Sequence, residues 1–346
     1  MQTDAAPNTF MRAEILETPD AVARLVERES GTFATLGRKL RGIDPRVVVT
    51  AARGSSDNAA AYFKYLVEIL LGVPVASVGP SVASVYRAPL RLRDALVISV
   101  SQSGQSPDIV ALQQAAREAG AFSIAVCNQP ASPLASAADV TIPLHAGPEQ
   151  SVAATKTCLG SAVALASLVA EWKDDDQLRR TIMRLPESLH RTLACEWSEA
   201  LPVFTAATSA YVVGRGPALP VAAEAALKFK ETAVLHAEAF SGAEVMHGPL
   251  QLLQPRFPVL AFLQDDAAKP GMVETVARLR AAQGHVFAVG AGQNGTGALP
   301  CVATGHAALD PLAMLLAFYG FAEQIARARG HDPDRPSLLR KVTETV

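Results

Sequence analysis

Cysteine and aromatic residues are scarce in this chain, and neither sign of charge dominates it. The four cysteines are scattered, with no C-x-x-C pair and no metal-ligand spacing. This usage favours buried free thiols in a reducing compartment over disulfides or a metal site. Aromatic residues make up only 5% of the chain, whereas hydrophobic residues make up 49%. The cores should therefore be aliphatic, as they are in parallel α/β sheets.

Two kinds of partner are excluded by the charge balance and by the lengths of the apolar runs. Lysine and arginine number 31 against 33 acidic residues, and no basic stripe could follow a nucleic-acid backbone. The uncharged run Thr157–Ala170 is too short to span a bilayer. The N-terminal segment carries Asp4 and Glu14 and lacks the apolar stretch of a signal peptide. We therefore expect a soluble, cytoplasmic protein that binds neither nucleic acid nor membrane.

A length of 346 residues indicates about two domains. Apolar runs such as Val47–Ala51 alternate with helical patterns, among them Val152–Trp172, and Thr18-Pro19-Asp20 predicts a helix start. This alternation predicts an α/β protein with two doubly wound, flavodoxin-like parallel sheets. We place the boundaries as follows: N-terminal arm and helices 1–45, first domain 46–172, helical linker 173–202, second domain 203–335 and C-terminal tail 336–346.

The two predicted domains align with each other at an offset of 162 residues, which places Val97–Val100 on Val259–Phe262. At this register the loop Ser101–Gly104 faces Leu263–Asp266, which has two carboxylates in place of hydroxyl groups. We interpret the chain as a tandem duplication in which only the first half binds phosphate. The alternative is that α/β units resemble one another without common descent.

The segment Ala95–Val110 predicts a buried strand, a loop rich in hydrogen-bond donors and a helix. The loop, residues 101–106, reads Ser-Gln-Ser-Gly-Gln-Ser and contains no lysine or arginine. Hydroxyl groups and free backbone N–H groups at a helix N-terminus favour an anion. A serine-rich turn without a ligand is the plain alternative. The unbroken order of strand, donor cluster and helix favours a phosphate site.

The densest polar cluster lies in the second half, within Lys228–Leu250. Lys228 and Glu231 stand three residues apart on one helix face, in apolar surroundings that shift pKa values. A surface ion pair would also explain that spacing. His247 precedes Gly248-Pro249 in a turn and is a plausible acid–base partner, although a lone histidine is usually structural. No H-E-x-x-H pattern is present, so we predict no metal.

These motifs resemble the tandem sugar isomerase (SIS) domain proteins, in particular the isomerase half of glutamine–fructose-6-phosphate aminotransferases. The resemblance covers about residues 45–346 and rests on RGSSDNAA, SQSGQSPD, SVAATK, GRGPALPVAAEAALKFKE, HAEAFSGAEVMHGPL and RPSLLRKVTE. It implies a sugar-phosphate substrate and a homodimer. It also implies that neither a metal nor an organic cofactor is needed.

The resemblance implies roles for residues at matching positions. One group matches the residues that bind the substrate phosphate: Ser55, Ser101, Gln102, Ser103 and Ser106. A second group, Val152 and Ala153, matches the segment that contacts the sugar hydroxyls.

The catalytic residues implied by the resemblance lie in the second half. Glu231 matches the base that moves a proton between C1 and C2, and Lys228 matches its partner at the open-chain sugar. His247 matches the ring-opening acid–base residue, which the family supplies across a dimer interface. Lys341 matches, with a one-residue gap, the tail lysine that forms an imine with the ketose. By composition alone, Lys341 is a solvated tail lysine.

Several departures from the aminotransferase pattern affect the expected reaction. Ala154 replaces a serine, Arg53 a cysteine and Gln105 a glutamate, which changes the pocket wall. About 45 residues precede the first strand, and none matches the glutaminase domain. We therefore expect an isomerising deaminase that converts glucosamine 6-phosphate to fructose 6-phosphate and ammonia, like the stand-alone SIS-type deaminases. The alternatives are an aminating isomerase, a fructosamine-6-phosphate deglycase and a non-catalytic sugar-phosphate sensor.

Overall fold

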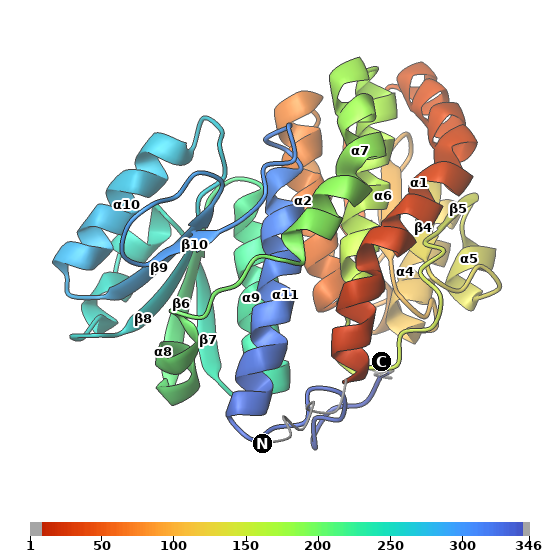
Figure 1. The fold of residues 1–346 in the computed structure, drawn as a ribbon. Helices are drawn as coiled ribbons and strands as arrows, with labels where there is room; N and C mark the ends of the chain where they lie inside the picture. Colours follow the sequence, from red (N-terminus) through yellow and green to blue (C-terminus); the bar gives the residue numbers. More distant parts are fainter. Residues whose placement is uncertain (1–8, 342–346) are drawn as a thin grey trace.

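A computed structural model of the chain describes residues 9–341 and shows two α/β units side by side (Figure 1). Each unit contains a five-stranded parallel sheet with flanking helices, which confirms the predicted fold class. All four cysteines are free. Within the described residues, no helix is long and apolar enough to cross a membrane.

The first sheet has the strand order β2-β1-β3-β4-β5, and every pair is parallel. Its strands are short apolar runs: β1 (Val48–Ala51), β2 (Val75–Ser77), β3 (Leu96–Val100), β4 (Phe122–Cys127) and β5 (Val140–Pro143). The helices of this unit are α2 (Ser55–Leu70), α3 (Ser81–Ser84), α4 (Pro107–Glu118), α5 (Pro133–Ala137) and α6 (Lys156–Lys173). Strand β3 is buried along its whole length, as its unbroken apolar sequence predicts.

The second sheet repeats this topology. Its order, β10-β9-β8-β6-β7, reads from the other end as the same winding as the first sheet. The strands are β6 (Ser209–Gly214), β7 (His236–Ser241), β8 (Pro258–Phe262), β9 (His285–Gly290) and β10 (Ala298–Pro300). The helices are α8 (Leu201–Ala206), α9 (Ala218–Ala233), α10 (Lys269–Ala281), α11 (Asp310–Ala328) and two short 3₁₀ turns, η1 (Glu244–Met246) and η2 (Pro249–Leu252). The shared winding supports the interpretation as a duplication.

Two helix boundaries differ from those predicted. The chain begins with one long helix, α1 (Phe10–Ile43), capped by Thr9, so the predicted start at Thr18-Pro19 is wrong. Pro19 lies inside this helix, where the hydroxyl of Thr18 donates to the carbonyl of Glu14. The predicted start of α6 at Val152 is also wrong, because residues 149–155 are irregular.

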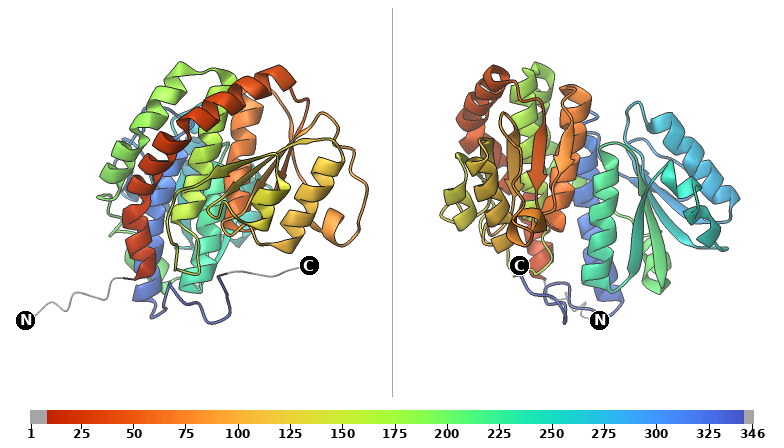
Figure 2. Two further views of the ribbon diagram at one scale, coloured as in Figure 1. Left: turned by 90° about the vertical axis from the view of Figure 1, so that its right-hand side faces the viewer. Right: turned by 180° about the vertical axis from the view of Figure 1, so that it is seen from behind.

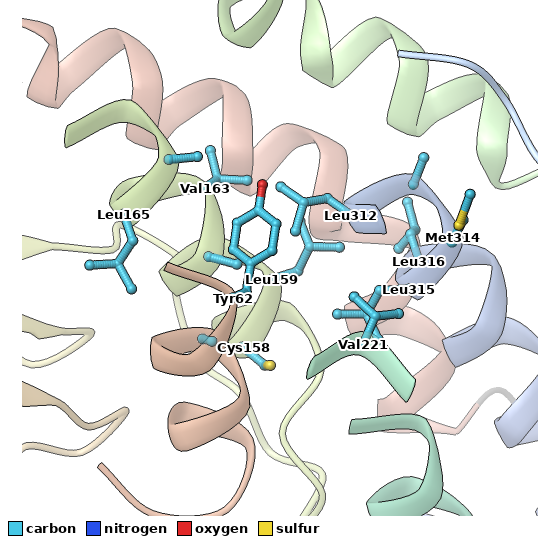
Figure 3. Packing of buried hydrophobic residues seen from close by; sticks show 14 of the residues in the cluster. Tyr62, Cys158, Leu159, Val163, Leu165, Val221, Leu312, Met314, Leu315 and Leu316 are labelled. Atoms are coloured by element: carbon cyan, nitrogen blue, oxygen red, sulfur yellow. The ribbon is translucent and has the colours of Figure 1, made fainter. Parts of the chain in front are cut away.

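The core that joins the two units is built from helices of both. Tyr62 of α2, Leu159 and Val163 of α6, Val221 of α9 and Leu312 of α11 pack together (Figure 3). Helix α6 is buried on nearly every face, which is typical of a helix inside a core. Figure 2 shows α1 along the outer side of the first unit, where it packs on α6 and on α7 (Asp176–Thr192).

The two sheets point their carboxyl ends in opposite directions. Helices α2 and α9 stand next to each other between the sheets (Figure 2). Ser55, the first residue of α2, contacts Lys228 in the later part of α9. Tyr65 lies near the other end of α2. Its pKa is raised by the charge of Glu244 and lowered by that of Arg215, so both residues lie near it. The helices are therefore antiparallel, and the carboxyl end of the first sheet faces the C-terminal half of α9.

Candidate active site at the carboxyl end of the first sheet

The main cavity of the site has a volume of about 500 Å³ and lies where β1 and β3 end. It is lined by residues 53, 54 and 56, residues 100–103 and 106, Ile109 and Lys341. The strand β2 is added on one side of β1, and β3, β4 and β5 are added on the other side. The gap between β1 and β3 is therefore the topological switch point, where open α/β sheets bind ligands. The cavity is therefore in the place that the topology favours.

The predicted phosphate loop forms one wall of this cavity. The hydroxyl of Ser101 accepts the backbone N–H of Gly104 at 3.2 Å, and that of Ser103 accepts the N–H of Gln105 at 3.3 Å. Gly104 has a φ of 63°, and a Cβ at this position would collide with the hydroxyl of Ser132. The turn therefore requires glycine.

Two helix N-termini meet at the cavity, those of α2 and α4. The residues that precede them, Gly54 and Ser106, form no side-chain cap with the first turn of the helix. Pro107, the first residue of α4, has no N–H, and the N–H of Ile109 is bonded to the Asp108 carboxylate. The dipoles of both helices still place their positive ends at the cavity, and Arg53 and Lys341 add cationic side chains to its lining. This arrangement suits an anion.

An ion pair between the exposed Arg53 and the buried Asp108 supports the same wall. Arg53 donates from Nε and Nη2 to Oδ2 of Asp108, at 3.0 and 2.8 Å. The Asp108 side chain is only 2% exposed, so its charge is balanced by Arg53. Sequence reasoning recorded Arg53 only as a departure from the family pattern. It missed this pair because 55 residues separate the partners.

Lys228 joins the second domain to this cavity. Its side chain is fully buried, and Nζ donates to the hydroxyl of Ser55 at 2.9 Å and to the carboxylate of Glu231. Glu224 lies 3.2 Å from the same nitrogen. Burial alone would lower the pKa of Lys228, but Glu224 and Glu231 outweigh it and raise that pKa. Lys228 is therefore an ammonium group, and it is not the base.

Glu224 and Glu231 differ in access to solvent. Burial raises the pKa of Glu224, with Lys228 opposing the shift, and its carboxylate also accepts from Asn58 and Tyr319. The Glu231 side chain is 23% exposed and lines a second hollow of about 440 Å³ beside the C-terminal tail. Glu231 is thus the member of the pair that can meet a ligand. Sequence reasoning missed Glu224, although its i,i+4 spacing to Lys228 in an apolar helix was a usable signal.

The tail lysine is held inside the site and is not a free tail residue. Lys341 Nζ donates to Glu149 Oε2 at 3.0 Å and to the carbonyl of Ser151 at 2.6 Å. Glu149 is buried and also accepts the backbone N–H groups of Thr155 and Thr157 at the start of α6. The interpretation from composition alone is wrong, because Lys341 lines the main cavity.

The two residues matched to sugar contacts lie in the irregular segment 149–155. The N–H of Val152 donates to the carbonyl of Asp334 in the tail at 3.1 Å, and Ala153 is buried. Among the described residues, the lining of the main cavity includes neither of them.

His247 does not join Glu231 within one chain. It is exposed in the loop between η1 and η2, beyond the carboxyl end of β7. Glu231 lies near the amino end of β7, and a six-residue strand spans roughly 17 Å at ~3.3 Å per residue. The two side chains therefore belong to opposite ends of the second domain.

Metal chemistry has no evident ligand set in this part of the chain. Within residues 9–341, no group of three or more His, Cys, Asp or Glu side chains is arranged to hold a metal ion. The cationic side chains of the site are Arg53 and Lys341, which line the main cavity, and Lys228, which contacts Ser55.

Comparisons with known proteins agree with this geometry. Residues 43–170 and 204–296 match the SIS domain. The glutamine–fructose-6-phosphate aminotransferase [isomerizing] of Aquifex aeolicus (strain VF5) is 31% identical over 345 residues, covering 97% of this chain and 58% of that protein. The corresponding protein of Leifsonia xyli is 32% identical over 362 residues. The chain spans 58% of the length of both relatives.

Solved structures share the fold. A protein from Silicibacter pomeroyi DSS-3, described as a candidate phosphosugar isomerase, is 48% identical with a TM-score of 0.90 and covers 94% of this chain and 100% of its own. The C-terminal domain of the glucosamine-fructose-6-phosphate aminotransferase from Francisella tularensis is 24% identical, with a TM-score of 0.81, and covers 97% and 100%. The glucosamine-6-phosphate deaminase of Thermotoga maritima is 19% identical, with a TM-score of 0.77, and covers 97% and 100%. The last two show the fold alone.

Proposed function

The chain belongs to the SIS domain family, and from that premise we propose that it is a phosphosugar isomerase-type enzyme. Its reaction is the isomerising deamination of glucosamine 6-phosphate to fructose 6-phosphate and ammonia. The observation that carries this proposal is the contact of one buried ammonium, Lys228, with both Glu231 and Ser55, whose two neighbours in sequence line the main cavity. An anion site and a proton-transfer carboxylate are thereby held at a fixed separation.

The phosphate end of the substrate binds at the loop Ser101–Ser106, between the N-termini of α2 and α4. Serine hydroxyls, Gln102 and free backbone N–H groups supply the hydrogen bonds. This end of the sugar carries no chemistry, and its binding energy positions C1 and C2.

Glu231 is the proposed base over C1 and C2 of the open-chain sugar. It removes the proton from C2, which gives an enolamine, and returns a proton to C1, so that C1 becomes a hydroxymethyl group and C2 an imine. The imine at C2 is then the group that loses ammonia. One carboxylate suffices because both protons travel on the same face. Lys228 stabilises the developing negative charge beside it.

Lys341 is proposed to act at C2 after isomerisation. Its neutral amine displaces ammonia from the imine, and hydrolysis of the resulting lysine imine releases the ketose. Because the amine must lose a proton before it attacks, its contacts with Glu149 and Ser151 bear directly on this step.

A homodimer is part of the same proposal. His247 is exposed at the far end of the second domain, so it can serve ring opening only in the site of a partner subunit. A strictly monomeric protein with full activity would contradict this role.

The decisive experiment incubates purified protein with glucosamine 6-phosphate and, separately, galactosamine 6-phosphate, and measures released ammonia and the ketose 6-phosphate. Ammonia from either sugar supports the deaminase. Ammonia from neither contradicts it. Supplying fructosamine 6-phosphate in a third arm tests the deglycase.

The aminating direction is the second candidate. The observation that favours it is the 31% identity to an aminotransferase across 97% of this chain. The test supplies fructose 6-phosphate with ammonium ions or with glutamine and measures glucosamine 6-phosphate. Product from glutamine alone would support the aminotransferase over the deaminase.

A further inference from the structure

Glu14, in the second turn of α1, is a buried carboxylate that the proposed reaction does not use. It is 5% exposed. Oε1 accepts the backbone N–H groups of Gln150 and of Ser151, the latter at 3.3 Å. Oε2 is buried and has no hydrogen-bond partner among the described residues. Burying a carboxylate with an unpartnered oxygen lowers the stability of the folded state.

Ser151, one of the two residues that Glu14 holds, also holds Lys341. Ser151 donates its N–H to Glu14 and accepts from Lys341 Nζ through its carbonyl, at 2.6 Å. The preceding Glu149 accepts from the same nitrogen at 3.0 Å. A single segment of three residues thus separates Glu14 from the tail amine.

The start of α1 is tied to the tail by a second contact. The carboxylate of Asp334 accepts the backbone N–H groups of Phe10 and Met11, at 2.7 Å each. The carbonyl of Asp334 accepts from Val152, next to the segment that Glu14 holds. Helix α1 therefore holds both the 149–152 segment, which binds Lys341, and the tail, which carries Lys341.

The charges around Glu14 make its state sensitive to pH. Burial raises the pKa of Glu14 to about 7; Glu149 adds to the rise, whereas the N–H groups of Gln150 and Ser151 and the charge of Lys341 oppose it. The charged groups that face Glu14 from packed elements are Glu149, from the segment before α6, and Lys341, from the tail. The positive charge of Lys341 favours the ionised form of Glu14.

We propose that Glu14 is a positioning residue for Lys341, acting through the peptide groups of Gln150 and Ser151. It rests on the proposed function in one respect, since Lys341 is taken as the amine that reacts at C2. Glu14 itself touches no substrate. Its effect is to hold the Lys341 amine at Glu149 and at the carbonyl of Ser151 until a ligand replaces those contacts.

The test measures the reactivity of Lys341 directly. Reductive methylation with formaldehyde and cyanoborohydride, followed by peptide mass spectrometry, reports the modification rate of Lys341 between about pH 6 and pH 9. Glu14→Gln removes the charge, and Glu14→Asp keeps it but withdraws the carboxylate from the two N–H groups. We expect Lys341 to be modified several-fold faster in both variants. Glu27→Gln, at an exposed position of the same helix, should match the wild type.

A kinetic arm separates positioning from a general structural role. In Glu14→Gln, kcat for glucosamine 6-phosphate should fall about ten-fold or more while KM changes less than about three-fold. The pH profile of kcat should lose the inflection near the pKa of Glu14, about 7.

The outcomes distinguish this inference from the proposed function. Wild-type rates of Lys341 modification in a folded Glu14→Gln variant, at every pH, would overturn the inference. If neither Glu14 variant folds, the wild-type curve of modification rate against pH decides, because a single ionisation with no inflection near pH 7 would also overturn it. Absence of ammonia from the wild-type protein contradicts the proposed function and leaves the labelling result standing.

Discussion

The carboxyl ends of the two sheets have the same topology and different chemistry. In the first, residues 101–106 form a hydroxyl-rich turn beside a cavity of about 500 Å³. In the second, Gln264 donates to the carboxylate of Asp266, and Asp266 also accepts the N–H of Ala268 just before α10. The Asp266 carboxylate thus occupies the side-chain amide and backbone N–H donors that a bound anion would need. The duplicated scaffold kept its core while its end loops diverged.

The helices that face these two carboxyl ends also differ in the chemistry of their side chains. The first end faces the part of α9 that carries Lys228 and Glu231. At the offset of 162 residues, the matching positions on α2 are Leu66 and Ile69. The second end therefore has neither the phosphate loop nor the acid–base pair. The two differences fall at the same end, which supports the proposal of the first end as the active one.

The largest expected effect comes from removing the cation that joins the domains. Lys228→Met leaves Glu224 without its buried partner, so the free energy of unfolding should fall by about 3–5 kcal/mol and turnover should disappear. Urea denaturation monitored by circular dichroism measures the loss. Lys64→Met is the matched control, since Lys64 is 42% exposed on α2, and it should stay within ~0.5 kcal/mol of the wild type. Wild-type stability of the Lys228 variant would contradict the assigned contacts.

The proton-transfer step should depend on Glu231 and not on an exposed glutamate elsewhere in the second domain. Glu231→Gln should lower kcat by about 10²–10⁴-fold, because the amide keeps the shape and cannot take a proton. Sugar-phosphate binding, measured by calorimetry, should survive. Glu274→Gln, exposed on α10, is the control and should turn over like the wild type. Residual activity above about a tenth of the wild-type value would remove Glu231 from the role of base.

The phosphate turn should depend on glycine at one position. Gly104→Ala forces a Cβ into the hydroxyl of Ser132 at a φ of 63°, so KM for the sugar phosphate should rise about ten-fold or more through an opened loop, with a strain of about 1–3 kcal/mol. Steady-state kinetics measures the change. Gly31→Ala, with nothing near its added Cβ, should leave KM unchanged. An unaltered KM in the Gly104 variant would place the phosphate elsewhere.

The smallest effect is expected at the second carboxyl end. Asp266→Ala removes the acceptor for the N–H of Ala268 and should cost about 1 kcal/mol of stability, while turnover stays within about two-fold of the wild type. Thermal denaturation and the ammonia assay report the two quantities. A loss of activity larger than the loss at Gly104 would show that the second end takes part in the reaction.

Most strands were predictable because they are buried runs of apolar residues, as in β3 and β8. Strand β7 was missed, since His236 and Glu238 interrupt its apolar pattern on a half-exposed strand. Strand β10 was missed because it is three residues long and ends in Pro300. The prediction began a helix at Thr18-Pro19, whereas α1 begins at Phe10, continues through Pro19 and packs against α6 and α7.

The sequence by itself determined the apolar strands, the hydroxyl-rich turn at residues 101–106 and the pairing of Lys228 with Glu231, because each depends on residues close in the chain. Only the tertiary structure decided which partners those groups meet. Ser55 reaches Lys228 across 173 residues, and Lys341 reaches Glu149 across 192. The first contact depends on the antiparallel packing of α2 and α9, and the second depends on how α1 holds the 149–152 segment and the tail. No local sequence pattern encodes either arrangement. The opposite orientation of the two carboxyl ends, and with it the place of His247, has the same origin.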